Sequence, residues 1–213
     1  MGTHPIAGYT SLTLARVIDT QDPDSRGRVR VKLLAVDMEL WAEVAVASAG
    51  RKYGVHLLPK RDEIVVVAFL DHEMAVVMGA LWTGSSPLPQ EAGEVEKRYS
   101  ITMPSGSVLY FDDDGQAKVV VTTPAGPKVT ITDEAGGKIK AEVSGNSVTI
   151  TTSKVEIQAS SEVTVQAGQV KVSAGMVTVD AGMSKFSGVV KCDTLIANSV
   201  VSSSYTPGAG NIW

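Results

Sequence analysis

Residues 148–179 read VTITTSKVEIQASSEVTVQAGQVKVSAGMVTV, and this stretch decides the fold class. It repeats an apolar–x–apolar pair. The pairs begin at residues 148, 155, 163, 170 and 177, so the spacing is seven, eight, seven and seven residues. Because side chains alternate between the two faces of a strand, each pair predicts one very short strand with two apolar side chains on one face. Two earlier pairs, Val129/Ile131 and Ile139/Ala141, extend the series toward the N-terminus.

Strands this short cannot enclose a hydrophobic core by themselves. Three chains wound around one axis would each supply one strand per layer, and every strand edge would then be paired with a neighbouring chain. We therefore predict an intertwined homotrimeric β-helix, with a β-sandwich formed by a single chain as the alternative. The side chains predicted to form the trimer core are Val148, Ile150, Val155, Ile157, Val163, Val165, Val170, Val172, Val177 and Val179.

Composition narrows the functional classes. The chain has 213 residues, a formal net charge of −4 and a single cysteine, which excludes an intrachain disulfide framework. Its three histidines all lie within the first 72 residues, so the second half offers no histidine-based triad or metal cage. No apolar run reaches the roughly 18 residues of a membrane span, and the N-terminus lacks signal-peptide features. We therefore expect the protein to be synthesised and assembled in a cytoplasm.

The N-terminal part has a different organisation. Alternating or continuous apolar patterns predict strands at 13–18, 28–34, 41–45, 63–69 and 75–81, and five short strands in so few residues are typical of a small closed barrel or sandwich. Residues 85–97, SSPLPQEAGEVEK, are predicted to be a linker. The predicted divisions are a barrel domain at 1–84, this linker, a stem start at 98–125, the β-helical spike at 126–201 and a C-terminal segment at 202–213.

Three stretches resemble a known family. Residues 24–31, DSRGRVRV, resemble the GRVRV strand of the phage baseplate assembly protein V family. Residues 54–84 resemble its second block, and residues 105–115, SGSVLYFDDDG, resemble the start of the stem in VgrG-like spike proteins. In the second block, the positions that match the family pattern are Pro59, Asp62, Glu63, Phe69, Asp71, Gly79 and Trp82.

The resemblance implies an all-β chain: an N-terminal OB-fold barrel followed by an intertwined homotrimeric β-helix, or needle. It implies a structural rather than enzymatic role, as the central spike of a contractile tail baseplate that pierces the outer envelope of the target cell on sheath contraction. Similar spikes occur in myophages and R-type bacteriocins. The expected partners are two further copies of the chain, a baseplate hub protein, a PAAR-like tip protein and, transiently, the target-cell outer membrane. The expected location is the baseplate centre of a virion or tail-like particle assembled in the bacterial cytoplasm.

Two other functional classes are alternatives to this role. A trimeric receptor-binding or glycan-cleaving tailspike would need a groove lined by aromatic side chains or paired carboxylates, and the stem is sparse in both. A nucleic-acid-binding OB protein would need a basic excess, whereas residues 1–84 hold nine Lys and Arg against ten Asp and Glu. Arg26, Arg28, Arg30 and Lys32 alternate along one strand, which fits a solvated or subunit-contacting face better than a phosphate track.

The candidate ligand sites are few, and we predict no cofactor. Asp112, Asp113 and Asp114 precede Gly115, which is a hairpin-turn signal, with a bound structural ion as the alternative. His56 and His72 lie near carboxylates in the sequence but lack a third ligand at useful spacing. No histidine lies near the C-terminus, so we do not expect the tip iron site of some relatives. Near the C-terminus, the candidates for docking a tip protein, or for sealing the trimer end, are Tyr205, Ile212 and Trp213.

Overall fold

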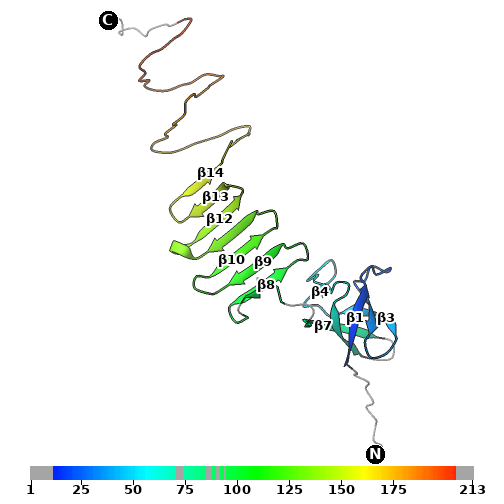
Figure 1. Cartoon of the computed structure of the whole chain (residues 1–213). Helices are drawn as coiled ribbons and strands as arrows, with labels where there is room; N and C mark the ends of the chain where they lie inside the picture. Colours follow the sequence, from blue (N-terminus) through cyan, green and yellow to red (C-terminus); the bar gives the residue numbers. More distant parts are fainter. Residues whose placement is uncertain (1–11, 71–73, 85–87, 90–91, 94, 205–213) are drawn as a thin grey trace, which may run out of the picture. The chain divides into compact units, whose positions relative to one another are not determined.

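The computed structural model describes residues 12–70, 74–84, 88–89, 92–93 and 95–204. The first of its two main elements is a closed five-stranded barrel with the order β1-β2-β3-β7-β6 (Figure 1). Neighbouring strands are antiparallel except β3 and β7, which pair in parallel and close the barrel. The barrel strands are β1 (Leu12–Asp19), β2 (Val29–Leu33), β3 (Glu39–Val44), β6 (Ile64–Phe69) and β7 (Ala75–Leu81).

Alternation along β2 shows how the sequence forms the barrel. Val29, Val31 and Leu33 are buried, whereas Arg30 and Lys32 point outward to solvent. The interior is filled almost wholly by valine and alanine, whose small volumes suit a barrel of five short strands. The buried core consists of Ala15, Val17, Val29, Val31, Leu33, Ala42, Val65, Val67, Ala75 and Val77.

The all-β class and the N-terminal barrel expected from the sequence are confirmed. Each of the five expected barrel strands is present, with ends that differ by no more than two residues. The structure adds a small hairpin, β4 (Ala49–Gly50) and β5 (Tyr53–Gly54), between β3 and β6.

The second main element is a seven-stranded antiparallel sheet. Its strands follow one another in chain order from β8 to β14, so each pairs only with its neighbours in the sequence (Figure 1). The β11–β12 connection contains a short 3₁₀ turn at Glu134–Gly136. The strands are β8 (Arg98–Thr102), β9 (Val108–Asp112), β10 (Lys118–Thr122), β11 (Lys128–Thr132), β12 (Lys138–Val143), β13 (Asn146–Thr151) and β14 (Val155–Gln158).

This sheet crosses the division expected between stem start and spike at residues 125 and 126 without interruption. Residues 159–204, by contrast, form no strand and are exposed along their whole length. Within the part of the chain that the structure describes, there is no helix with the length and apolar character of a membrane span. In residues 98–158 each strand pairs with strands of the same chain, so the expectation that strand edges pair with neighbouring chains does not hold for this part of the stem. The trimer itself stays a prediction.

Candidate functional site

One face of the seven-stranded sheet carries two unbroken apolar rows. The strand registers place one residue of each strand opposite one residue of the next, so each row crosses all seven strands. The first row is Tyr99, Phe111, Val119, Ile131, Ile139, Ile150 and Val155. The second row is Ile101, Leu109, Val121, Val129, Ala141, Val148 and Ile157. We call this surface the apolar face.

The apolar face is open to solvent. Tyr99 is 77% exposed, Phe111 52% and Ile131 48%, although such side chains in a finished fold are normally covered. A shallow hollow of about 510 Å³ lies over β11 to β14 and includes Val129, Val148 and Ile157 in its lining. A contiguous apolar patch on this scale marks a surface that contacts another molecule.

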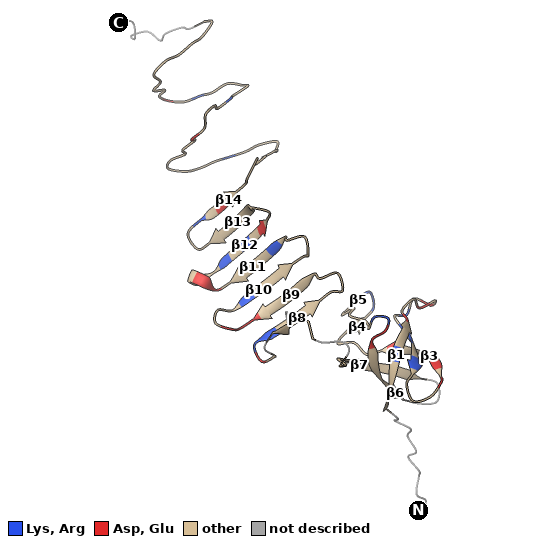
Figure 2. Cartoon of the chain, viewed as in Figure 1, with Lys and Arg blue, Asp and Glu red and all other residues tan. Residues whose placement is uncertain are grey.

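The opposite face is mostly polar, apart from Val108, Tyr110 and Val120 on β9 and β10, of which the two valines are buried. Lysine, threonine and glutamate side chains of β10 to β14 point to this side, and charged residues recur from strand to strand (Figure 2). Lys140 forms an ion pair with Glu142 on β12, and Lys154 pairs with Glu156 at 2.6 Å. The sheet is therefore amphipathic, with one face suited to solvent and the other suited to burial against another surface.

A buried ion cluster holds the first three strands together on that polar face. Asp112 is 1% exposed. Its carboxylate accepts a hydrogen bond from Arg98 and lies 3.3 Å from Lys118 Nζ. The Arg98 guanidinium also lies 5.0 Å from the centre of the Tyr110 ring. The backbone N–H of Asp114, together with Arg98 and Lys118, stabilises the ionised carboxylate and lowers the pKa of Asp112 to about 2.

The three consecutive aspartates do not converge on one point. Asp112 is committed to the ion cluster, and Asp114 instead pairs with Lys97 at 2.9 Å. Gly115 follows with a φ of +82°, as the hairpin-turn interpretation requires. Among the described residues there is no group of three or more His, Cys, Asp or Glu side chains arranged to hold a metal ion.

The sequence-predicted core residues fall into two sets. Val148, Ile150, Val155 and Ile157 all lie in the two rows of the apolar face. The other six lie in the strandless segment 159–204 and are exposed in the single chain; they are Val163, Val165, Val170, Val172, Val177 and Val179. The tip candidates Tyr205, Ile212 and Trp213 lie outside the described residues, so their role stays a prediction.

Sequence reasoning missed the part of the apolar face on β8, β9 and β10. Tyr99/Ile101, Leu109/Phe111 and Val119/Val121 are also apolar pairs, but they recur every ten residues rather than every seven or eight. The longer step reflects five-residue strands joined by hairpin turns such as 103–107. The available signal was the same pair pattern at a different period.

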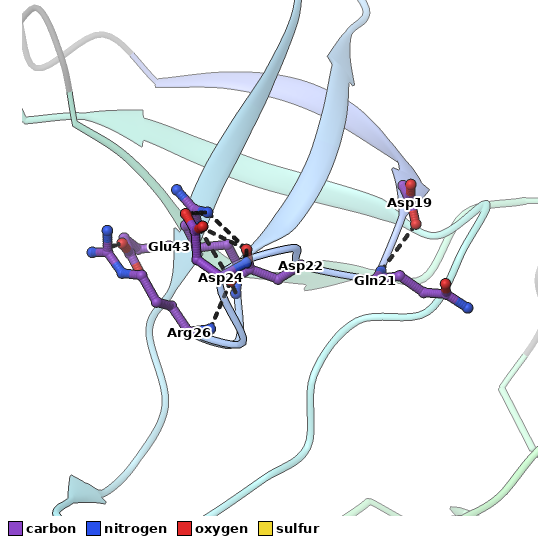
Figure 3. A network of polar contacts seen from close by, with 7 residues as sticks. Asp19, Gln21, Asp22, Asp24, Arg26 and Glu43 are labelled. Carbon is purple, nitrogen blue, oxygen red and sulfur yellow. Dashed lines mark hydrogen bonds and ion pairs between the residues drawn. The ribbon is translucent and has the colours of Figure 1, made fainter.

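The barrel carries its own polar network on the turn between β1 and β2 (Figure 3). The Asp22 carboxylate accepts from the Arg28 side chain at 2.7 Å and from the backbone N–H groups of Asp24, Arg26 and Arg28. These bonds, led by that from Arg28, hold the pKa of Asp22 far below its usual range. Arg28 also pairs with Asp24 at 2.5 Å, and its guanidinium lies 5.7 Å from the Trp41 ring centre.

Each of the four alternating cations of the barrel therefore already pairs with a carboxylate. Beyond Arg28, Arg26 pairs with Glu43, Arg30 with Glu39, and Lys32 with Asp37. A row of neutralised cations is a poor phosphate track, because counterion release requires charge that is not already balanced. Of the two histidines considered, His56 is exposed and His72 lies outside the described residues.

Comparison with known proteins agrees with this geometry. Residues 13–82 match a family model described as the Type VI secretion system/phage-baseplate injector OB domain. The matched range begins in β1 and ends just after β7, so it coincides with the closed barrel. A search of curated proteins finds no match to the chain.

Proposed function

Because residues 13–82 match the family model of the Type VI secretion system/phage-baseplate injector OB domain, we propose that this chain is the central spike of a contractile injection machine. In this proposal three copies assemble around one axis, with the barrels as a collar and the stems as a needle. The role is mechanical rather than enzymatic: sheath contraction drives the needle through the outer envelope of the target cell. The location is the baseplate centre of a virion or tail-like particle.

The apolar face carries the proposal. Within the described residues no second sheet covers it, and its side chains are 40–77% exposed except for Leu109, Val119 and Ala141, which are half-buried. Three amphipathic sheets facing one axis would bury all fourteen row positions and leave the lysine and threonine side chains outside. Burying one Val or Ile side chain contributes about 1.5–3 kcal/mol, so the gain grows with every strand added.

The sheet geometry also suits a load along the needle axis. Strands stack in chain order from β8 to β14, so the backbone hydrogen bonds run from one strand to the next along the direction of stacking. Six spacings of about 4.8 Å give a stack of roughly 29 Å for this part of the stem. If one hydrogen bond breaks, the neighbouring hydrogen bonds of the ladder and the packed apolar core still hold the strands together.

The partners follow from the proposed place in the machine. A hub protein would receive the collar, and a PAAR-like tip protein would receive the far end of the needle. The last nine residues contain the apolar candidates Tyr205, Ile212 and Trp213 for that docking. Contact with the target outer membrane would be transient.

Solution mass tests the trimer directly. Light scattering on a sizing column should give three times the 22.3 kDa chain mass, and an unheated sample should stay trimeric in detergent. Ile150→Asp should prevent trimer assembly, because it places three carboxylates against one apolar core. Thr149→Asp, one residue away on the polar face, should leave the trimer intact. A compact monomer for the unmodified chain, or a trimer for both variants, would refute the proposal.

A further inference from the structure

Part of the connection between β3 and β6 (residues 45–63) differs in charge from the rest of the barrel. Residues 45–61 read AVASAGRKYGVHLLPKR and contain four cations and no acidic residue, and Asp62 and Glu63 follow directly before β6. We call this segment the basic loop. The four cations of the β1–β2 turn and β2 are each paired with a carboxylate, as described above. In contrast, the basic-loop cations make no ion pair with any described residue; they are Arg51, Lys52, Lys60 and Arg61.

Apolar side chains share this exposed segment. Tyr53 is 73% exposed, Val55 42% and Leu57 58%, and they occur at every second position. Aromatic and aliphatic side chains surrounded by arginine and lysine are the composition of a protein–protein contact, with an apolar centre and a charged rim.

The basic loop is also held in a defined shape. Residues Ala49 and Gly50 pair with Gly54 and Tyr53, and the Val55 N–H donates to the Ser48 carbonyl at 2.9 Å. The Tyr53 ring lies directly on Gly50, where a Cβ would come within 2.0 Å of the ring. The ring is therefore oriented by the hairpin while most of its surface stays open. A preorganised contact loses less conformational entropy on binding.

The C-terminal end of the basic loop is anchored to the barrel. Pro59 is buried and Leu58 half-buried, next to Gly27 of the β1–β2 connection. The tip is thus exposed while its base is fixed. The anchoring favours a constant docking position over a loop that searches for its partner.

We propose that the basic loop docks onto an acidic surface of another protein in the baseplate, with Tyr53 as its central contact. This inference rests on the proposed function, which supplies the baseplate as the assembly. A protein partner fits better than single-stranded nucleic acid, which needs several stacking aromatics where the loop offers only Tyr53. A rigid hairpin with three apolar side chains likewise lacks the broad apolar face of a membrane-bound amphipathic helix.

Photocrosslinking in assembled particles identifies the partner. The full chain, with p-benzoylphenylalanine at position 53, is produced in cells that make the contractile particle, and purified particles are irradiated and digested. We expect crosslinks to an acidic segment of a different baseplate protein. The same probe at Met38, exposed in the β2–β3 turn, is the control and should not give that crosslink.

Charge reversal tests the electrostatic part. Arg51→Glu should lower the number of copies per particle at least tenfold, and replacing an acidic residue of the crosslinked segment with lysine should restore it. Arg16→Glu makes the same charge change at an exposed barrel position outside the loop and should have no effect. Both variants should keep the solution mass and thermal midpoint of the unmodified chain, since neither position is buried.

The failures are distinguishable. If unmodified chain is absent from purified particles, the proposed function is wrong and the baseplate partner falls with it. If the chain is present but position 53 crosslinks to nothing or only to another copy of the same chain, the docking inference alone is wrong. Binding of the full chain to a single-stranded oligonucleotide or to phosphatidylglycerol vesicles, lost in Arg51→Glu, would also overturn it by assigning the loop another class of partner.

Discussion

At the scale of single residues, two buried carboxylates do the most structural work. Asp22 closes the β1–β2 connection by accepting hydrogen bonds from three backbone N–H groups and one guanidinium. Asp112 joins Arg98 of β8 and Lys118 of β10 from its position at the end of β9. Both side chains are shielded from water, so each negative charge depends on hydrogen bonds and ion pairs within the protein. A different local fold would not bring these partners together.

Asp112 should make stem stability sensitive to acid. Its folded pKa of about 2 lies below the ordinary value of 3.8, so its contribution is present above about pH 4 and is lost as the pH falls through about 2. Asp112→Asn should lower the thermal midpoint at neutral pH by roughly 5 °C, with a smaller difference at pH 2. Thermal unfolding followed by circular dichroism at both pH values checks this, with Asp113→Asn as the control. An equal difference at both pH values would argue against the ion cluster.

At the scale of elements, the small hairpin shows how glycine fixes a surface. Gly54 has a φ of +153°, and a Cβ there would lie 2.4 Å from the Ser48 carbonyl oxygen. Neither condition tolerates a side chain, because the backbone occupies a region that is essentially restricted to glycine. The closed shape of the basic loop therefore depends on this residue.

Gly54→Ala should open the hairpin at a cost of about 1–3 kcal/mol. Hydrogen exchange should show faster exchange at the Val55 N–H, which donates to Ser48 in the closed hairpin. Gly79→Ala, on β7, is the matched control: a Cβ there meets nothing within 4 Å, so exchange should stay unchanged. Unchanged exchange at Val55 in the Gly54 variant would mean that the hairpin does not depend on this glycine.

The elements also show where sequence reasoning succeeds. The barrel strands were predictable because apolar and polar residues alternate along segments such as 28–34, and burial on one side enforces that alternation. The hairpin was not, because two-residue strands such as Tyr53–Gly54 contain no period to detect. The apolar pairs from Val148 to Ile157 lie on β13 and β14, and their place in a trimer core stays a prediction; their alignment into two rows depends on cross-strand register between separate hairpins. Neither the Asp112 cluster nor the Asp22 network has a local sequence signal of its own.

At the scale of the whole molecule, the single chain leaves its apolar surface unfinished. The sheet makes its backbone hydrogen bonds within the single chain, but its apolar face is not buried. Residues 159–204 form no strand and stay exposed in the single chain, although their apolar pairs continue the pattern of β13 and β14. We expect the apolar face to be buried, and residues 159–204 to form strands, only when the stems of three copies assemble.

Val165→Asp tests whether the segment 159–204 takes part in the core. The variant should fail to form the stable trimer, because three carboxylates would meet in an apolar interior. Gln166→Asp, the next residue, would point outward and should assemble normally. Solution mass and hydrogen exchange over 159–204 provide the measurement, with protected amides expected in the trimer and rapid exchange in the Val165 variant. A folded, soluble trimer of Val165→Asp would contradict the inward register.

The strict chain order of β8 to β14 bears on how such stems can change length over evolutionary time. Each strand reverses the direction of the one before it, and each strand-and-turn unit of the first part repeats every ten residues. Duplication of one strand-and-turn unit would make the chain leave the sheet on the opposite side, whereas duplication of two units restores the original side. Stem length is therefore expected to vary among descendants in whole hairpins, by steps of about 9.6 Å, without redesign of either end.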